Sequence, residues 1–437
     1  YTIATNKQGR QQPTLCPRVF FINMLDIIHT IASRFHLLGD TVVLSILAAG
    51  QFDNHLWRII VAAACSRLHP LLIPADSVLA TAWYFYWPFF LAHVYAIFNV
   101  PHLRSRQPRL GCTFVTGADS GMGQATVLHL ASTPGPKGSY HDCIFAGAYD
   151  APGAEKKFAE LLAGNEQALK KIVVVSLDVT SDKSVGNAAS TTELCMAKTP
   201  TVGLTSVINF HGVAFNGPTE YMPIAMYQRQ HDVNYIGNLR MVQAFLPLVK
   251  SAVGSVSAGH RARFIFTGTG GGACSPCPSL LSAYMSSKFA VEAMCQSLRM
   301  EMHMLGRPID CCVINPGFVK PTMLMEEGIR MTTKMWGGCR DAMEGSTAAE
   351  DEYGPMMEHF VKYSAAVPGE HVSAVARAAD DALTAYMPRT SYKVGIDSKL
   401  APIVGLLPTG LRELMARHGM YGKLSPAGTV KGYEVGC

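Results

Sequence analysis

Charged side chains are scarce in this sequence. Asp, Glu, Lys and Arg together make up 16% of the 437 residues, whereas hydrophobic residues make up 49%. Disordered chains have the opposite balance, so this composition excludes an intrinsically disordered protein. About a quarter of the residues are charged in ordinary soluble domains, and we therefore expect the apolar surplus to be concentrated in one part of the chain.

Three further absences narrow the class of protein. The sequence has no Asn-x-Ser/Thr sequon, so nothing indicates a glycosylated, secreted protein. Its 37 basic residues barely exceed its 32 acidic residues and form no Lys/Arg-rich run, which argues against nucleic acid as a partner. The 12 cysteines are scattered along a long chain without the dense spacing of a disulfide scaffold, which favours reduced thiols.

Charge is absent altogether from one long segment. No Asp, Glu, Lys or Arg occurs in residues 77–100, which as a helix would extend ~36 Å and could cross a ~30 Å hydrocarbon core. Arg104, Arg106 and Arg109 follow, and this positive charge predicts that the rest of the chain lies on the matrix or cytosolic side. We predict a membrane anchor here, with a buried or interfacial helical hairpin as the alternative.

Acidic side chains are also missing from residues 1–25, which contain Lys7, Arg10 and Arg18. This composition is typical of organelle-targeting segments. We therefore favour a membrane-associated protein of the mitochondrial inner membrane, with the endoplasmic reticulum as the alternative. The domain prediction is an N-terminal hydrophobic helical membrane region at residues 1–108 and a second domain at residues 109–437.

A glycine-rich turn marks the start of the second domain. An apolar strand at residues 112–116 leads into the pattern T-G-x-x-x-G-x-G, and a helical pattern follows. A glycine loop between a strand and a helix lets backbone N–H groups and the helix N-terminus approach a pyrophosphate. We therefore predict a dinucleotide-binding loop that consists of Gly117, Ser120, Gly121, Met122 and Gly123.

Short apolar runs alternate with helical patterns throughout this domain. The further runs predicted to be strands are residues 143–148, 172–177, 204–209, 263–267 and 310–315. Continuous apolar strands separated by helices are typical of a parallel sheet covered on both faces. The predicted fold class is therefore α/β, a doubly wound Rossmann-type parallel sheet that binds ligands at the carboxyl ends of its strands.

Further motifs follow the glycine loop in register with this pattern. In chain order they are Asp178-Val179, Asn234, Tyr284-x-x-x-Lys288 and Pro316-Gly317. From about residue 109 to the 390s or beyond, the chain thereby resembles the short-chain dehydrogenase/reductase family. The resemblance implies a cofactor site that includes Asp178, Val179, Asn209, Gly212, Lys288, Pro316 and Gly317.

Within that family, the chain is most similar to the membrane-associated hydroxysteroid, retinol and 3-hydroxybutyrate dehydrogenases. The segments that carry this similarity are residues 145–147, 152–155, 379–383, 388–389 and 407–411. An apolar N-terminal anchor before the glycine loop fits the same group.

Tyr284 and Lys288 are four residues apart and therefore share one face of a helix. An ammonium group beside a phenol favours the phenolate and lowers the phenol pKa, so we expect Tyr284 to act as general acid and base. The resemblance implies that Lys288 also holds the nicotinamide ribose, and that Asn234 supports a water molecule in a proton relay.

Two departures from the family pattern affect the catalytic region. The family has a serine thirteen residues before the tyrosine, where this sequence has Gly271. The intervening segment is longer than usual, so Thr269 is our first candidate for the missing hydroxyl and Ser275 the second. Phe210-His211 replaces the usual Asn-Ala, and we interpret His211 as a packed or cofactor-adjacent residue in preference to a catalytic one.

The choice of cofactor depends on charge near the end of the second strand. A ribose 2′-hydroxyl is bound by a carboxylate, whereas a 2′-phosphate requires Arg or Lys. Asp150 follows the strand and Asp119 lies in the glycine loop, which favours NAD. Lys156 and Lys157 on the next helix leave NADP open.

Two other features bear on ligands. Methionines are frequent between residues 322 and 357, and their adaptable side chains suit a lipophilic substrate, although core or partner contacts would use them equally well. In this region Thr322 comes one position later than the family threonine. The Cys274-x-x-Cys277 pair has no second pair at zinc-ligand spacing, so we predict no metal site.

Two functions of different class remain open. The first is an NAD-dependent oxidoreductase that transfers a hydride between nicotinamide and a lipophilic secondary alcohol or ketone at a membrane. The second is a catalytically weakened accessory subunit of a mitochondrial membrane protein complex, which binds the nucleotide structurally and has no substrate. Tyr284, Lys288 and Asn234 favour the first, and the missing serine and Phe210-His211 favour the second.

Overall fold

The computed structural model describes residues 107–136, 140–198, 203–255, 261–270, 272, 277–322, 330, 347–385, 388–405 and 407–421. The chain divides into two units, residues 1–100 and 101–437, and every described residue belongs to the second. The membrane segment predicted at residues 77–100 lies outside the described residues, and the predicted boundary at residue 108 stays a prediction. Across the described ranges, no helix has the length and apolar character needed to span a bilayer.

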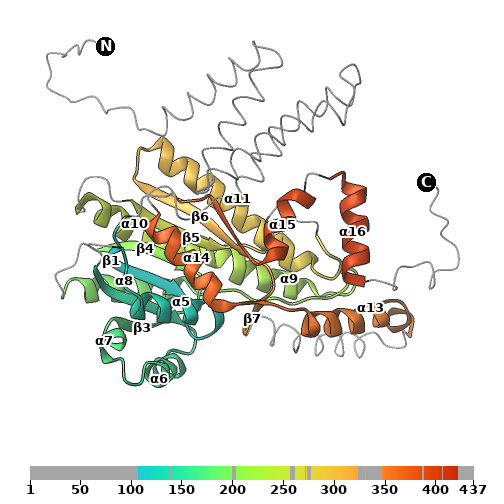
Figure 1. Cartoon of the computed structure of the whole chain (residues 1–437), viewed down its shortest axis with the longest axis horizontal. Coiled ribbons are helices and arrows are strands. Elements are labelled where there is room, and N and C mark those ends of the chain that lie inside the picture. The colour runs from blue at the N-terminus through green and yellow to red at the C-terminus, as the bar shows by residue number, and fades with distance from the viewer. Residues whose placement is uncertain are drawn as a thin grey trace, which may run out of the picture. The chain divides into compact units, whose positions relative to one another are not determined.

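A seven-stranded parallel sheet forms the centre of the second unit (Figure 1). Its strands are β1 (Leu110–Thr116), β2 (Tyr140–Ala148), β3 (Ile172–Ser176), β4 (Leu204–Asn209), β5 (Ala262–Thr267), β6 (Ile309–Pro316) and β9 (Ser391–Val394). They lie in the order β3-β2-β1-β4-β5-β6-β9. The order reverses between β1 and β4, where a ligand crevice is expected at the carboxyl ends. The predicted α/β Rossmann-type parallel sheet is confirmed.

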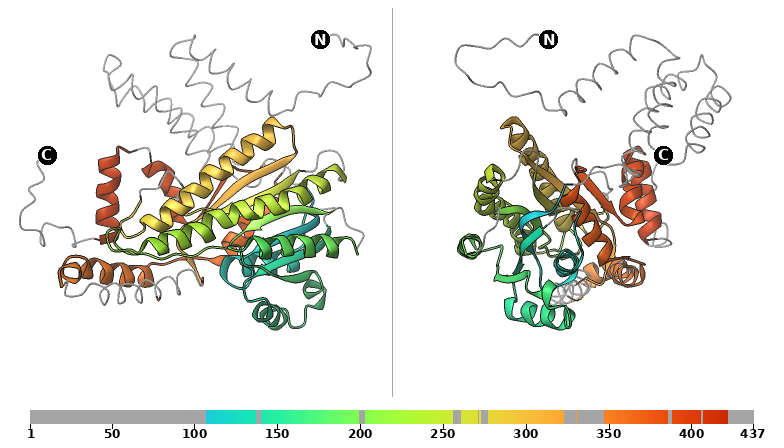
Figure 2. Two further views of the ribbon diagram at one scale, coloured as in Figure 1. Left: turned by 180° about the vertical axis from the view of Figure 1, so that it is seen from behind. Right: turned by 60° about the vertical axis from the view of Figure 1, so that its left-hand side comes forward.

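Helices cover both faces of this sheet (Figure 2). One face carries α5 (Gly121–Ser132), α6 (Ala151–Leu161), α7 (Glu166–Leu169) and α14 (Val372–Thr384). The other carries α8 (Asp182–Met196), α10 (Gly237–Ser255) and α11 (Ser282–Met304). The helix α9 (Ile224–His231) and a π-helical turn, η2 (Asp232–Ile236), lead into α10. The remaining elements are β7 (Val319–Lys320), α13 (Thr347–Ala366), β8 (Glu370–His371), α15 (Ile396–Val404) and α16 (Thr409–Tyr421).

The strand sequences are apolar at consecutive positions because both faces are buried. Val115 of β1 belongs to the core beneath α5 and α14, whereas the adjacent Phe114 belongs to the core beneath α10 and α11. The ring centres of Phe114 and Phe245 are 4.5 Å apart, which packs β1 directly against α10. Such double burial fixes the sheet, and therefore the carboxyl ends of its strands, in one arrangement.

A buried ion pair joins the amino ends of β5 and β6 to α14. Arg263 is fully buried, and its Nη1 atom lies 2.8 Å from Oδ2 of Asp310. The same guanidinium donates hydrogen bonds to the carbonyl groups of Ala382 and Ala385 at 2.9 and 2.7 Å. Arg261 approaches the same carboxylate from a partly exposed position, with an Nε to Oδ2 distance of 2.8 Å. These contacts tie α14 to the amino ends of two interior strands, at the end of the sheet opposite the ligand crevice.

We expect Asp310→Ala to lower the free energy of unfolding by about 3 kcal/mol or more, because the Arg263 guanidinium would stay buried without its counter-charge. Arg261→Met removes the partly exposed partner of the same carboxylate and should cost less than about 1 kcal/mol. Thermal and denaturant unfolding followed by circular dichroism measures both losses. Equal losses would contradict the assignment of Arg263–Asp310 as the dominant pair.

Candidate active site

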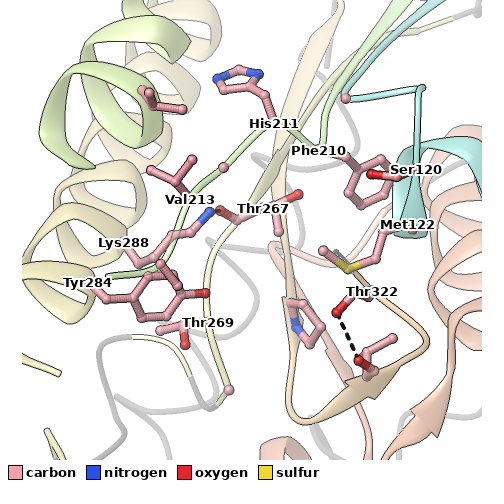
Figure 3. Close-up of a pocket in the computed structure, with 18 of the residues that line it drawn as sticks. Ser120, Met122, Phe210, His211, Val213, Thr267, Thr269, Tyr284, Lys288 and Thr322 are labelled. Carbon is pink, nitrogen blue, oxygen red and sulfur yellow. Dashed lines mark hydrogen bonds between the residues drawn. The ribbon is translucent and has the colours of Figure 1, made fainter. Parts of the chain in front are cut away.

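One pocket gathers most of the predicted site residues at the carboxyl ends of the strands (Figure 3). Its volume is about 640 Å³. The predicted residues that line it are Gly117, Ser120, Gly121, Met122, Asp178, Val179, Gly212, Thr269, Tyr284, Lys288, Pro316 and Gly317. The predicted residues outside its lining are Gly123, Asp150, Asn209 and Asn234. Motifs from several strands and from α11 therefore converge on this cavity.

The glycine loop between β1 and α5 has the geometry of an anion site. Gly117 and Gly121 have φ values of +62° and +52°, which side chains other than glycine rarely adopt. A Cβ atom at Gly123 would overlap the carbonyl group of Gly117, so α5 packs directly on the loop. Ser120 occupies the N-cap of α5 without a side-chain capping bond, and the first turn has no acidic residue. Within the part of the chain that the structure describes, no side chain caps the N–H groups of this turn, and they fit a pyrophosphate.

Asp178 shapes the turn after β3. Its Oδ1 atom accepts hydrogen bonds from the N–H and the hydroxyl of Thr180, at 2.9 and 2.7 Å. Desolvation would raise the pKa of Asp178, but these hydrogen bonds and the charges of Arg229 and Arg240 outweigh it and lower the pKa. The carboxylate is therefore ionised and fixes the turn that contains Val179, which lines the pocket.

Tyr284, Lys288 and Thr269 lie together at one end of the pocket (Figure 3). The hydroxyl of Thr269 lies near the Tyr284 phenol (Figure 3), and it donates a weak hydrogen bond to Sδ of Met285 at 3.9 Å. The Thr269 N–H donates to Oδ1 of Asn315 at 3.1 Å, which fixes this residue at the end of β5. Nζ of Lys288 lies 5.9 Å from the centre of the Tyr284 ring and donates to the carbonyl of Thr267 at 3.1 Å.

Burial changes the pKa values of both titratable groups. Desolvation raises the pKa of Tyr284 to about 12, although the nearby Thr269 hydroxyl opposes this shift. Desolvation also lowers the pKa of Lys288 to about 8. The sequence-based expectation that the ammonium would lower the phenol pKa is wrong for this structure, since desolvation dominates and Nζ of Lys288 bonds to the Thr267 carbonyl.

Asn234 holds the framework of the site from inside η2. Its Oδ1 atom accepts the N–H of Val213 at 2.8 Å, and its Nδ2 atom donates to the carbonyl of Val213 at 2.9 Å and to Oγ of Ser287 at 3.0 Å. The Asn234 carbonyl accepts a bond from Nδ2 of Asn238 at 2.6 Å. The side chain therefore positions its neighbours, and the predicted role in a water relay stays a prediction.

His211 is held as a neutral ring by Thr116. The Thr116 hydroxyl oxygen accepts the N–H groups of Phe210 and His211, at 3.0 and 3.3 Å. Its proton is therefore directed at Nδ1 of His211, 2.8 Å away, which assigns the ring proton to Nε2. Desolvation, with a smaller effect from the Lys288 charge, lowers the pKa of His211 to about 3. The ring points away from Tyr284, which agrees with a packing role (Figure 3).

Two of the predicted cofactor residues, Asn209 and Asp150, do not line the pocket. Asn209 is almost fully buried, its carbonyl accepts the Thr267 hydroxyl at 2.7 Å, and within the described ranges neither polar atom of its side chain has a hydrogen-bond partner. Asp150 caps the N-terminus of α6, where its Oδ1 accepts the N–H of Gly153 at 3.0 Å. Gly271, Ser275 and Cys274 lie outside the described residues.

Several lining residues had no role in the sequence-based prediction. Phe360 and Ser364 of α13 line the pocket from a segment without a family motif. Asp397 accepts the N–H of Phe318 at 2.9 Å and so braces the Pro-Gly segment. Thr322, although one position late, lies against the glycine loop, 3.5 Å from the place a Gly121 side chain would take. Within the described ranges no cluster of metal-ligand side chains occurs.

A family model described as short chain dehydrogenase matches residues 112–331. That match covers half of the chain, and the chain therefore belongs to the short-chain dehydrogenase family. The glycine loop, Tyr284 and Lys288 all lie within the matched residues.

Curated relatives fall in the predicted group. D-beta-hydroxybutyrate dehydrogenase, mitochondrial, of Rattus norvegicus is 30% identical over 64% of this chain and 75% of its own length. Retinol dehydrogenase 5 of Mus musculus is 28% identical over 66% of the chain and 81% of its own. Short-chain dehydrogenase/reductase family 9C member 7 of Bos taurus is 27% identical, with coverages of 66% and 82%. These similarities bear out the predicted subgroup.

Among solved structures, a short chain dehydrogenase/reductase from Burkholderia phymatum in complex with NAD has a TM-score of 0.51 with this chain. It is 18% identical, and the match covers 71% of this chain and 95% of the other. At this identity the likeness shows the fold, and it agrees with the observed sheet.

The neutral, buried His211 predicts a specific dependence of stability on pH. Below pH 6.5 the unfolded chain protonates this histidine, but the folded protein resists protonation until about pH 3, so stability is lost as the pH falls between these values. From pH 7 to pH 5 the wild type should lose about 2 kcal/mol more than His211→Gln. Urea unfolding at both pH values measures the difference. The exposed His303→Gln serves as a control and should follow the wild type; a His211→Gln profile identical to the wild type would contradict the assignment.

Proposed function

We propose that this chain is a nicotinamide-dependent oxidoreductase that interconverts a secondary alcohol and a ketone on a lipophilic substrate. The observation that carries the proposal is the convergence of the Thr269 hydroxyl and the Tyr284 phenol in the pocket that also holds the glycine loop. A bound nicotinamide dinucleotide supplies or accepts the hydride. NAD is the preferred cofactor and NADP the alternative, a proposal supported by the Asp119 carboxylate in the lining of the pocket.

The hydroxyl groups of Thr269 and Tyr284 act on the same substrate oxygen in different ways. Thr269 donates a hydrogen bond that polarises a carbonyl, and Tyr284 delivers its proton to that oxygen or removes it in the oxidation direction. A phenol pKa of about 12 keeps the proton on Tyr284 at neutral pH, which suits the donor in ketone reduction. Lys288, with a pKa of about 8, stays largely protonated at pH 7 and can bind a ribose hydroxyl.

The far part of the pocket supports a lipophilic substrate. Pro278, Leu281, Met285 and Phe360 are apolar residues that line the same pocket as Tyr284. Apolar side chains bind by removing surface from water and do not recognise a hydrophilic ligand. The retinol dehydrogenase among the relatives acts, by its name, on a lipophilic alcohol.

No structural observation on the described residues favours the alternative of a catalytically weakened accessory subunit. The sequence features that favour it are the missing serine and Phe210-His211. Thr269 supplies a hydroxyl at the phenol, and His211 is accommodated by Thr116 away from Tyr284.

We expect Tyr284→Phe to lower kcat about 10⁴-fold, because it removes the transferable proton and leaves the ring. Its unfolding midpoint should match the wild type. Thr269→Ser retains the hydroxyl and should stay within about tenfold of the wild type, whereas Thr269→Ala should lose about 10²-fold. Steroid, retinoid and hydroxyacid panels with NAD and NADP provide the measurement. Wild-type turnover by Tyr284→Phe, or an inactive wild type on every panel, would refute the proposed function.

We also propose that the protein is associated with a membrane, the mitochondrial inner membrane in preference to the endoplasmic reticulum, through residues 77–100. This segment has no formally charged side chain, and one relative is named as mitochondrial. Alkaline carbonate should leave the full-length chain in the membrane pellet, whereas a chain that begins at Arg104 should be recovered in the supernatant. Release of the full-length chain would contradict an integral anchor.

A further inference from the structure

We propose that Asp119, and not Asp150, selects the 2′ substituent of the adenosine ribose, and that Lys157 sets the residual affinity for a 2′-phosphate. The inference rests on the proposed function, in which the pocket holds a nicotinamide dinucleotide. It deepens that function by naming the residues that decide between NAD and NADP.

The selecting group must lie where the glycine loop meets the end of β2. In folds of this type a carboxylate at that corner accepts a hydrogen bond from the 2′-hydroxyl, whereas a basic side chain there binds a 2′-phosphate. Asp119 from the loop and Tyr149 from the end of β2 both line the pocket at this corner. Tyr149 is 72% exposed, so the corner is open to a ligand.

Asp150 is engaged elsewhere. Its carboxylate caps α6 through the N–H of Gly153 and leaves no room for a side chain at that glycine. It is absent from the residues that line the pocket. A carboxylate that serves as an N-cap faces the helix whose N–H groups it satisfies, and here that helix lies outside the cavity.

The Asp119 carboxylate, in contrast, is bound to the backbone that follows β2. Its Oδ2 atom accepts the N–H groups of Tyr149 and Asp150, at 3.2 and 3.4 Å. Within the described ranges its other oxygen, Oδ1, accepts no hydrogen bond. One carboxylate oxygen is thus fixed by the end of β2 and the other can accept a ribose hydroxyl. The same negative charge repels a 2′-phosphate, which carries a charge of about −2.

The two lysines of α6 differ in position. Nζ of Lys157 donates to the backbone carbonyl of Asp119 at 3.2 Å, so its ammonium group lies at the selecting corner. Nζ of Lys156 is 4.0 Å from Glu160, and its side chain is 80% exposed. Lys157 can therefore attract a 2′-phosphate that Asp119 repels, whereas Lys156 provides a matched control on the same helix turn.

The test measures the dissociation constants of NADH and NADPH for the full-length protein, by calorimetry or nucleotide fluorescence, without turnover. In Asp119→Asn the amide oxygen still accepts the backbone N–H groups, and the negative charge is lost. We expect the ratio of the NADPH constant to the NADH constant to fall at least about tenfold in this variant. Asp150→Ser keeps a capping oxygen and should change the ratio by less than about twofold.

Lys157→Met should weaken NADPH binding about threefold to tenfold, with no effect from Lys156→Met. If Asp119→Asn fails to reach the wild-type unfolding midpoint, the two lysine variants still test whether this corner selects the 2′ substituent. The inference would be overturned if the ratio were unchanged in a folded Asp119→Asn, if Asp150→Ser shifted it equally, or if the two lysine variants had equal effects. In each of these cases, binding of NADH would still support the proposed nicotinamide cofactor. Failure of the folded wild type to bind either nucleotide would overturn the proposed function as well.

Discussion

The amide side chain of Asn234 is the constraint on which the geometry of the site depends. It binds both the N–H and the carbonyl of Val213, which follows β4, and it also reaches the hydroxyl of Ser287 on α11. Ser287 in turn donates to the carbonyl of Tyr284 at 2.7 Å. An amide can satisfy a donor and an acceptor at once, which neither a carboxylate nor an apolar side chain of similar size can do. The π-helical turn around Asn234, a feature frequent at functional sites, places this side chain inside the fold.

The fold was largely predictable because a doubly covered parallel sheet imposes a simple pattern. Six strands appear in the sequence as apolar runs, each beside a helical segment. The seventh, β9, could not be predicted, since it has four residues and its burial alternates, with Ser391 and Lys393 only partly buried. A short edge strand of this kind gains its identity from pairing with β6, which a local pattern does not contain.

The candidate site was predictable where it depends on spacing along one helix or one loop, as with Tyr284, Lys288 and the glycines. It was less predictable where a loop of variable length intervenes. Thr269 is fixed by the end of β5 and by Asn315, so its distance along the chain from the tyrosine is a poor guide. Asp150 illustrates a missed local signal: an aspartate just before Pro152 in the first turn is typical of a helix N-cap. The Thr116–His211 contact joins residues 95 positions apart and has no signal in the sequence.

The buried Arg263 also has a consequence for biosynthesis. Two of its carbonyl acceptors, on Ala382 and Ala385, lie 119 and 122 positions later in the chain. A nascent chain emerging from the ribosome would therefore already contain α11, with Tyr284 and Lys288, while this guanidinium still lacked those acceptors. The buried contacts at the amino ends of β5 and β6 can form completely only after α14 (Val372–Thr384) has been translated, so a late part of the chain is required to complete the core around these strands. Folding of the domain is in this sense coupled to the end of translation, and a chain truncated before residue 382 would retain its active-site motifs without a closed core.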